Sequence, residues 1–114
     1  MILVYDGTFE GFLSLVYEVY YEKLKPIKIY KTLPNEIIFE EIKTIETSLI
    51  NSIKVLDAIK AKFPKEILEK ILNIFMCDST EFEMALLEYI IIGFKEIKQL
   101  FNINLESIFY LNNL

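Results

Sequence analysis

Residues 2–12, ILVYDGTFEGF, decide how the chain begins to fold. The apolar run over residues 2–5 favours a short strand, and the Asp6-Gly7 pair is a turn signal that ends it. The side chain of Asp6 or Thr8 can then accept a hydrogen bond from an unpaired backbone N–H at the start of a helix. This stretch therefore predicts a strand that leads directly into a helix.

The predicted helix covers residues 8–24 and ends before Pro26. Glu10 falls in its first turn, where the helix dipole favours a negative charge. Gly11 is costly inside a helix, so we expect it either to pack closely on a neighbouring segment or to leave room for a ligand or a partner backbone. Apolar residues at spacings of three and four predict one buried face, made of Phe9, Phe12, Leu13, Val16, Tyr17, Tyr20 and Leu24.

The remaining chain reads as two more short strands and then helices. Alternation predicts a strand at residues 27–30, a loop follows at 32–41, and residues 42–46 favour a third short strand. Thr47 or Ser48 can cap a helix over residues 49–62, whose predicted inward face is Leu49, Ile53, Leu56, Ile59 and Phe63. Further helices are predicted at 64–76, at 81–101 after a capping box at Thr80, and at 105–111. The predicted fold is α+β and predominantly helical, with a βαβ-like start followed by a bundle of three to four helices.

Length and composition predict one domain that has a protein partner. The chain has 114 residues, of which 54% are apolar, and its mean hydropathy is +0.36. One core of this size does not need so much apolar side chain, so we expect an apolar face left for a partner. No apolar run approaches the roughly 20 residues of a membrane-spanning helix, and no basic segment precedes the N-terminal apolar residues. We therefore expect a cytoplasmic protein without a membrane partner.

Charge and missing residue types exclude several functions for this chain alone. It contains no His and no Arg, so it lacks the usual general base near neutral pH and the usual bidentate reader of phosphate and guanine. All twelve cations are Lys, against seventeen carboxylates, and the net charge is −5. Direct nucleic-acid binding by this chain alone is not expected, because such binding draws on clustered positive charge.

No catalytic constellation is visible in the sequence. The pairs Glu18/Glu22, Glu40/Glu41 and Glu81/Glu83 are expected to be solvated, and Glu88 is the carboxylate most expected to be partly buried. Cys77 has no His as a base, and its neighbour Asp78 opposes a lowered thiol pKa. The sequence predicts no metal site and no cofactor.

The string YDGTFEGF at residues 5–12, followed by Val16-Tyr17-Glu18, resembles the N-terminal signature of a bacterial domain-of-unknown-function family assigned to DNA metabolism. Later elements are also similar: Ile45-Glu46-Thr47, a helix begun by Pro, and a long helix with Leu87-x-Tyr89 and Ile92-Gly93-Phe94. Typical members are roughly twice as long and are encoded beside a radical SAM protein of DNA modification or repair. By this resemblance, residues 1–114 correspond to the N-terminal half of the family architecture.

Two hypotheses follow for the function. The resemblance implies a non-catalytic interaction or structural module, whose partner is a radical SAM protein, its own C-terminal half or a second copy. Alternatively, the turn formed by Tyr5, Asp6, Gly7, Glu10 and Gly11 contributes part of an enzyme active site that a C-terminal half or a partner completes. The family provides no catalytic residue that can be assigned to a position in this chain.

Overall fold

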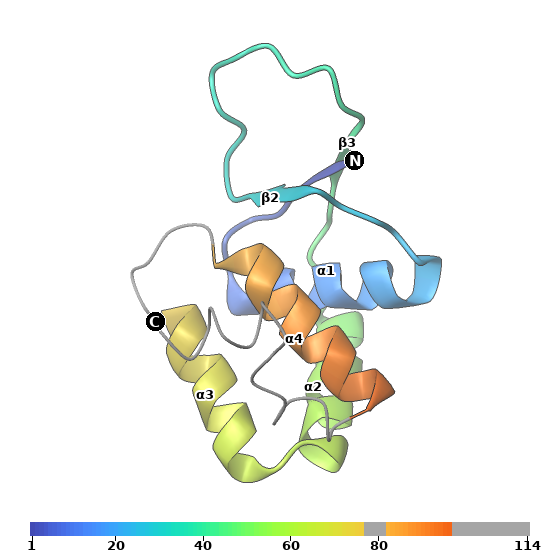
Figure 1. Ribbon diagram of the computed structural model, residues 1–114, viewed down its shortest axis with the longest axis vertical. Coiled ribbons are helices and arrows are strands. Elements are labelled where there is room, and N and C mark those ends of the chain that lie inside the picture. The colour runs from blue at the N-terminus through green and yellow to red at the C-terminus, as the bar shows by residue number, and fades with distance from the viewer. Residues whose placement is uncertain (77–81, 97–114) are drawn as a thin grey trace. The chain divides into compact units, whose positions relative to one another are not determined.

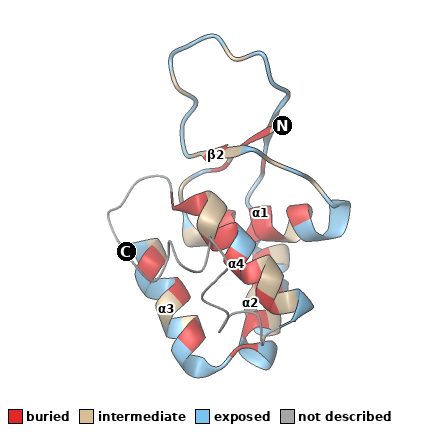
Figure 2. Ribbon diagram, in the orientation of Figure 1, coloured by how far each residue is buried: buried red, intermediate tan, exposed pale blue. Residues whose placement is uncertain are grey.

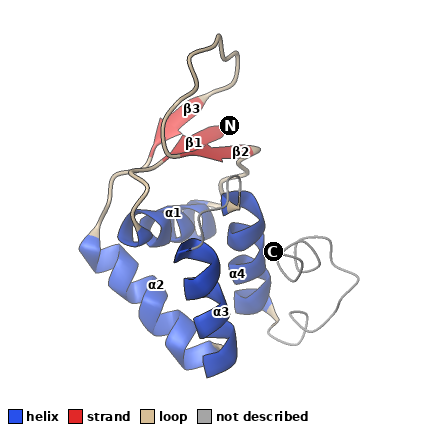
Figure 3. Cartoon of the chain, turned by 90° about the vertical axis from the view of Figure 1, so that its left-hand side faces the viewer, coloured by secondary structure: helices blue, strands red, loops and turns tan. Residues whose placement is uncertain are grey.

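A computed structural model describes residues 1–76 and 82–96, and it confirms an α+β fold that is mostly helical (Figure 1). In these residues, short strands of three residues lie in the first part of the chain, and the helices are 12 to 14 residues long (Figure 3). The elements are β1 (Ile2–Val4), α1 (Phe9–Glu22), β2 (Lys28–Tyr30), β3 (Ile42–Thr44), α2 (Leu49–Lys62), α3 (Lys65–Met76) and α4 (Glu83–Lys95). The chain divides into two compact units, Met1–Leu56 and Asp57–Leu114.

The first unit contains a parallel sheet with β1 in the centre, in the order β2-β1-β3. Ile2 is in register with Lys28 on one side and with Ile42 on the other. The ladder continues past β1, where Tyr5 N–H donates to the carbonyl of Tyr30 over 3.0 Å. The path from β1 through α1 to β2 is thus the predicted βαβ unit, with all three predicted strands present.

The predicted face of helix α1 is confirmed at Phe12, Leu13 and Val16 but was wrong at its two tyrosines. The buried residues of this helix are Gly11, Phe12, Leu13, Ser14, Leu15, Val16 and Val19 (Figure 2). Tyr20, expected inside, is exposed, as is Tyr21, and Tyr17 is only half-buried. Small residues at positions 11 and 14 allow close approach of another segment, and this turns the buried face toward Leu15 and Val19.

The end of α1 also differs from its prediction. The helix stops at Glu22, because Lys23 adopts a left-handed conformation with φ 54° and ψ 42°. The Lys23 N–H donates to the carbonyl of Val19, which closes the last turn. The stop signal is therefore the backbone at Lys23, three residues before Pro26.

Helix α2 has the predicted bounds, but the first half of its predicted face points outward. Leu49, Ile50 and Ile53 are exposed, whereas Ser52 and Val55 are buried. Farther along, Ile59 and Phe63 are buried as predicted. The contact that sets this rotation belongs to the candidate site and is described there.

The second unit contains the end of α2, then α3 and α4. The aromatic rings of Phe63 and Phe94 meet edge to face at 5.5 Å, as do those of Phe75 and Phe82. Helix α4 is shorter than predicted, because Glu96 is extended with φ −157°. It begins at Glu83 after Phe82, which forms no side-chain cap. Predictions on Cys77, Thr80 and the helix at 105–111 fall outside the described residues.

Candidate functional site

The candidate site is the turn between β1 and α1. Gly7 has φ +85°, a left-handed conformation that favours glycine over any residue with a Cβ. Thr8 is the N-cap of α1, since its Oγ1 accepts a hydrogen bond from the N–H of Gly11 over 2.9 Å. The predicted cap is therefore confirmed at Thr8, which leaves Asp6 free of that task.

Asp6 instead connects two segments that are 41 residues apart. Its Oδ1 accepts hydrogen bonds from the N–H of Thr8 at 2.9 Å and from the hydroxyl of Thr8 at 2.6 Å. Its Oδ2 accepts a hydrogen bond from the hydroxyl of Thr47 at 2.6 Å. Both carboxylate oxygens thus have donors within the chain, and Thr47, just before α2, is held to the turn after β1.

These donors also determine the protonation state of Asp6. The hydroxyl of Thr47, followed by the hydroxyl and N–H of Thr8, stabilises the carboxylate and lowers the pKa of Asp6 below its ordinary value of 3.8. Asp6 is exposed and ionised at neutral pH. A general acid or base needs a pKa closer to the working pH, so the hydrogen bonds make Asp6 a poor proton-transfer group.

The position of the Asp6 carboxylate leaves no room for a side chain at residue 11, and so requires glycine there. A Cβ at Gly11 would overlap Asp6 Oδ1 and would lie 3.0 Å from Thr47 Oγ1. The space beside Gly11 is thus occupied by the chain's own side chains. Of the two explanations offered for this glycine, close packing on a neighbouring segment is the one that the structure supports.

A second connection, between Ser14 and Ser48, was not predicted from the sequence. Ser14 is buried, and its Oγ lies 2.8 Å from the carbonyl of Glu10 and 3.1 Å from the carbonyl of Ser48, either of which can accept a hydrogen bond from its hydroxyl. The same Oγ accepts a hydrogen bond from the N–H of Ser48 at 2.9 Å. A small polar residue three positions after Gly11, within an apolar helix, is the sequence signal that marks this site.

The Ser14–Ser48 contact explains the rotation of α2. Ser48 Oγ accepts a hydrogen bond from Asn51 N–H and so caps the helix, as predicted. Ser48, Ser52, Val55 and Ile59 follow one another at helical spacing and share one face. Because Ser48 is held against Ser14, this face turns inward, and the more apolar face that includes Ile53 is left outside.

The remaining residues of the predicted turn have separate positions. Tyr5 is buried in the core, with its ring edge-on to Phe12 at 5.9 Å. Glu10 is exposed in the first turn of α1. The structure thus brings Asp6 and Gly11 together with Thr8 and Thr47, while Tyr5 contributes to packing.

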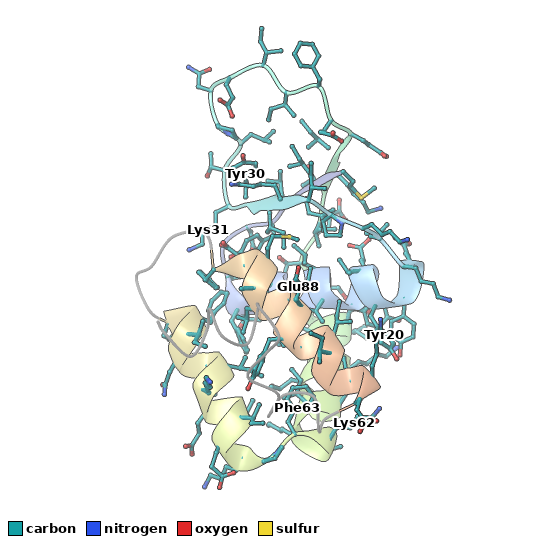
Figure 4. All side chains as sticks on the ribbon, in the orientation of Figure 1. Tyr20, Tyr30, Lys31, Lys62, Phe63 and Glu88 are labelled. Carbon is teal, nitrogen blue, oxygen red and sulfur yellow. The ribbon has the colours of Figure 1, made fainter. Side chains whose placement is uncertain are left out.

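Of the other predicted carboxylates, Glu81 lies outside the described residues, and all but Glu83 of the described ones lie at the surface. Glu40 Oε2 lies 3.2 Å from the N-terminal ammonium of Met1. Lys43 Nζ lies 3.7 Å from both Glu18 Oε1 and Glu22 Oε2 at the surface. Glu88 is exposed (Figure 4), so its predicted burial was wrong. Glu83 is the buried carboxylate instead, and it lies in the first turn of α4, where a negative charge is favoured.

In the second unit, one cation packs against an aromatic ring. Lys70 Nζ lies 5.7 Å from the centre of the Tyr89 ring. Burial lowers the pKa of Lys70 and raises the pKa of Tyr89, in each case by penalising the charged form. The pair therefore contributes packing on α3 and α4.

Within the residues that the structure describes, no three His, Cys, Asp or Glu side chains gather closely enough to hold a metal ion. Of the helices there, none combines the length and apolar character that crossing a membrane requires. Comparison with protein-family models, curated proteins and solved structures finds no match to this chain.

Proposed function

We propose that this chain is a non-catalytic interaction module of a DNA modification or repair system, and that it works with a radical SAM protein. The connection to DNA metabolism and to this partner is supported by the resemblance of YDGTFEGF at residues 5–12 to a family signature. The interaction role is supported by apolar side chains that the fold leaves in solvent.

The observation that carries the proposal is the outward face of the first half of α2. Leu49, Ile50 and Ile53 are 65%, 69% and 56% exposed, and they lie within about one helical turn. We call these three residues the α2 patch. Burying a large aliphatic side chain contributes about 1.5 kcal/mol or more, so the α2 patch provides about 5 kcal/mol toward association, before the cost of ordering the two proteins.

The catalytic alternative has less support from the same unit. Both carboxylate oxygens of Asp6 are already hydrogen-bonded within the chain, and Tyr5 is buried. A chain that binds a partner through the α2 patch needs neither residue for chemistry.

Binding of the purified chain to a radical SAM protein of the kind that members of the resembled family are encoded beside tests the proposal. We expect one complex in size-exclusion chromatography, and we expect the double variant Ile50→Lys/Ile53→Lys to weaken binding at least tenfold by calorimetry. Met76→Lys is the matched control, because Met76 is 81% exposed on α3, outside the α2 patch. Absence of a complex with the wild-type chain, or equal binding by the double variant and the control, would overturn the proposal.

A further inference from the structure

The connection between β2 and β3 is a crossover without a helix. Both strands run parallel to β1 and lie on opposite sides of it, so residues 31–41 must return the chain to the starting end of the sheet. Parallel strands are usually joined by a crossover whose helix packs on the sheet. Here the crossover loop, residues 31–41, instead arches away from α1 (Figures 1 and 3). Its end is fixed to the sheet, because Ile2 N–H donates to the carbonyl of Glu41 over 2.7 Å.

This loop exposes its largest apolar side chains. Phe39 is 96% exposed and Ile37 is 82% exposed, whereas Ile38 between them is half-buried. Figure 4 shows the side chains of the loop extending outward from its ribbon. Ordinary loops are polar, so a Phe and an Ile that lie two residues apart and are both in solvent form a ready anchor for another molecule.

The side chains around the anchor are acidic, and one of them is paired with the N-terminal ammonium of Met1, which lies 3.2 Å from Glu40 Oε2. Glu36 precedes Ile37, and Glu40 and Glu41 follow Phe39, while no lysine lies between Lys31 and Lys43. The anchor is thus an apolar pair bordered by three carboxylates, of which Glu40 is already neutralised by the N-terminus, whereas Glu36 and Glu41 carry the net negative charge. A complementary surface has an apolar pocket for the two side chains and basic residues around its rim.

We propose that the crossover loop inserts Ile37 and Phe39 into an apolar pocket of a protein partner whose rim is lined with Lys or Arg. The proposal rests on the proposed function in one respect, since it requires a protein partner, and it adds the chemistry of that partner's surface. An anionic lipid surface is a poorer match, because it repels this net negative charge. A second copy is also a poorer match, because each copy brings a net charge of −5 to the contact.

Site-specific photocrosslinking in cells tests this proposal without assuming the partner's identity. A photoreactive phenylalanine analogue replaces Phe39 in the full chain, with the same analogue at Met76 as a matched exposed control. We expect position 39, and not position 76, to crosslink to one protein, at a site that peptide mapping places beside Lys or Arg residues. That protein is then purified, and its binding to the wild type, Phe39→Ala and Glu36→Lys/Glu41→Lys is measured at low and high salt.

The expected result is at least tenfold weaker binding for each variant, with reduced salt dependence for the charge-reversal variant only. Unfolding midpoints equal to that of the wild type establish that the variants fold, as expected for side chains in solvent. Crosslinking to lipid, to a second copy or to nothing would overturn the proposal, as would a captured protein that binds Phe39→Ala as tightly as the wild type. If the captured protein meets these criteria but is not the radical SAM protein, the loop proposal stands and the proposed partner is wrong.

Discussion

Adding one methyl group at Gly11 tests the hydrogen-bonded arrangement around Asp6 directly. In an ordinary helix interior, Gly→Ala stabilises the folded state by about 1 kcal/mol. At Gly11 the new methyl group would overlap Asp6 Oδ1 and lie 3.0 Å from Thr47 Oγ1. The carboxylate must therefore swing outward, and its hydrogen bonds with Thr8 and Thr47 are weakened or lost.

The magnitude follows from those three hydrogen bonds. A hydrogen bond to a charged group contributes more than about 1 kcal/mol to the free energy of unfolding when it is shielded from water. Asp6 is exposed, so we take about 1 kcal/mol for each of its three hydrogen bonds. Loss of about 3 kcal/mol against a helix gain of about 1 kcal/mol leaves Gly11→Ala destabilised by about 2 kcal/mol. In an Asp6→Ala background the main obstacle is gone and the Thr47 hydroxyl is no longer held by the carboxylate, so the same substitution should stabilise the protein by up to about 1 kcal/mol.

A double-mutant cycle measures this coupling. Urea unfolding of the wild type, Gly11→Ala, Asp6→Ala and the double variant at pH 7 gives the four free energies of unfolding that the cycle needs. We expect Gly11→Ala to change sign between the two backgrounds. If the two single substitutions add to within about 0.5 kcal/mol, the carboxylate does not occupy the space beside Gly11, and the reasoning fails.

Three further predictions concern the same unit. Because the folded-state pKa of Asp6 is lowered, its stabilising contribution is complete above the unfolded-state pKa and is lost as pH falls through the folded-state pKa. The difference in free energy of unfolding between wild type and Asp6→Asn should be constant from about pH 7 to 5 and shrink below about pH 4. A difference that is as large at about pH 2.5 as at pH 7 in urea titrations would contradict this. Lys23→Gly should stabilise the folded chain by about 0.5–1 kcal/mol, because glycine adopts the left-handed conformation without the steric penalty of a Cβ. An unchanged melting temperature would argue against backbone strain at Lys23. Ser14→Ala should lower the free energy of unfolding by about 1–3 kcal/mol, because it removes the contact with Ser48. The matched buried control Ser52→Ala loses only a hydrogen bond to the carbonyl of Leu49 in its own helix, so chemical denaturation should show a smaller decrease. Equal decreases for the two variants would show that the Ser14–Ser48 contact does not contribute more than a hydrogen bond within one helix.

Local features of the fold were predicted well because their causes lie within a few residues. The three strands, the cap at Thr8 and the bounds of α2 depend on β propensity, on a hydroxyl three residues before an N–H, and on Pro64 after Lys62. The candidate turn was also located from the sequence, since an Asp-Gly pair between a predicted strand and a predicted helix indicates a turn. The role of each side chain in the turn could not be predicted, because the hydroxyl that donates to Asp6 Oδ2 belongs to Thr47, which is 41 residues away.

The sequence by itself determined the order and type of the elements, since strand propensity, capping and helical periodicity act over one or two turns of chain. Only the tertiary structure decided how the buried faces of α1 and of the first half of α2 are turned. Ser14 holds Ser48, which turns Val55 inward and leaves Ile53 in solvent, although periodicity favoured Ile53 for the core. A helix with apolar residues on more than one side permits several rotations, and contacts between segments distant in the chain select one of them. The apolar side chains left outside by that selection, together with those of the crossover loop, are the surfaces on which the proposed function rests.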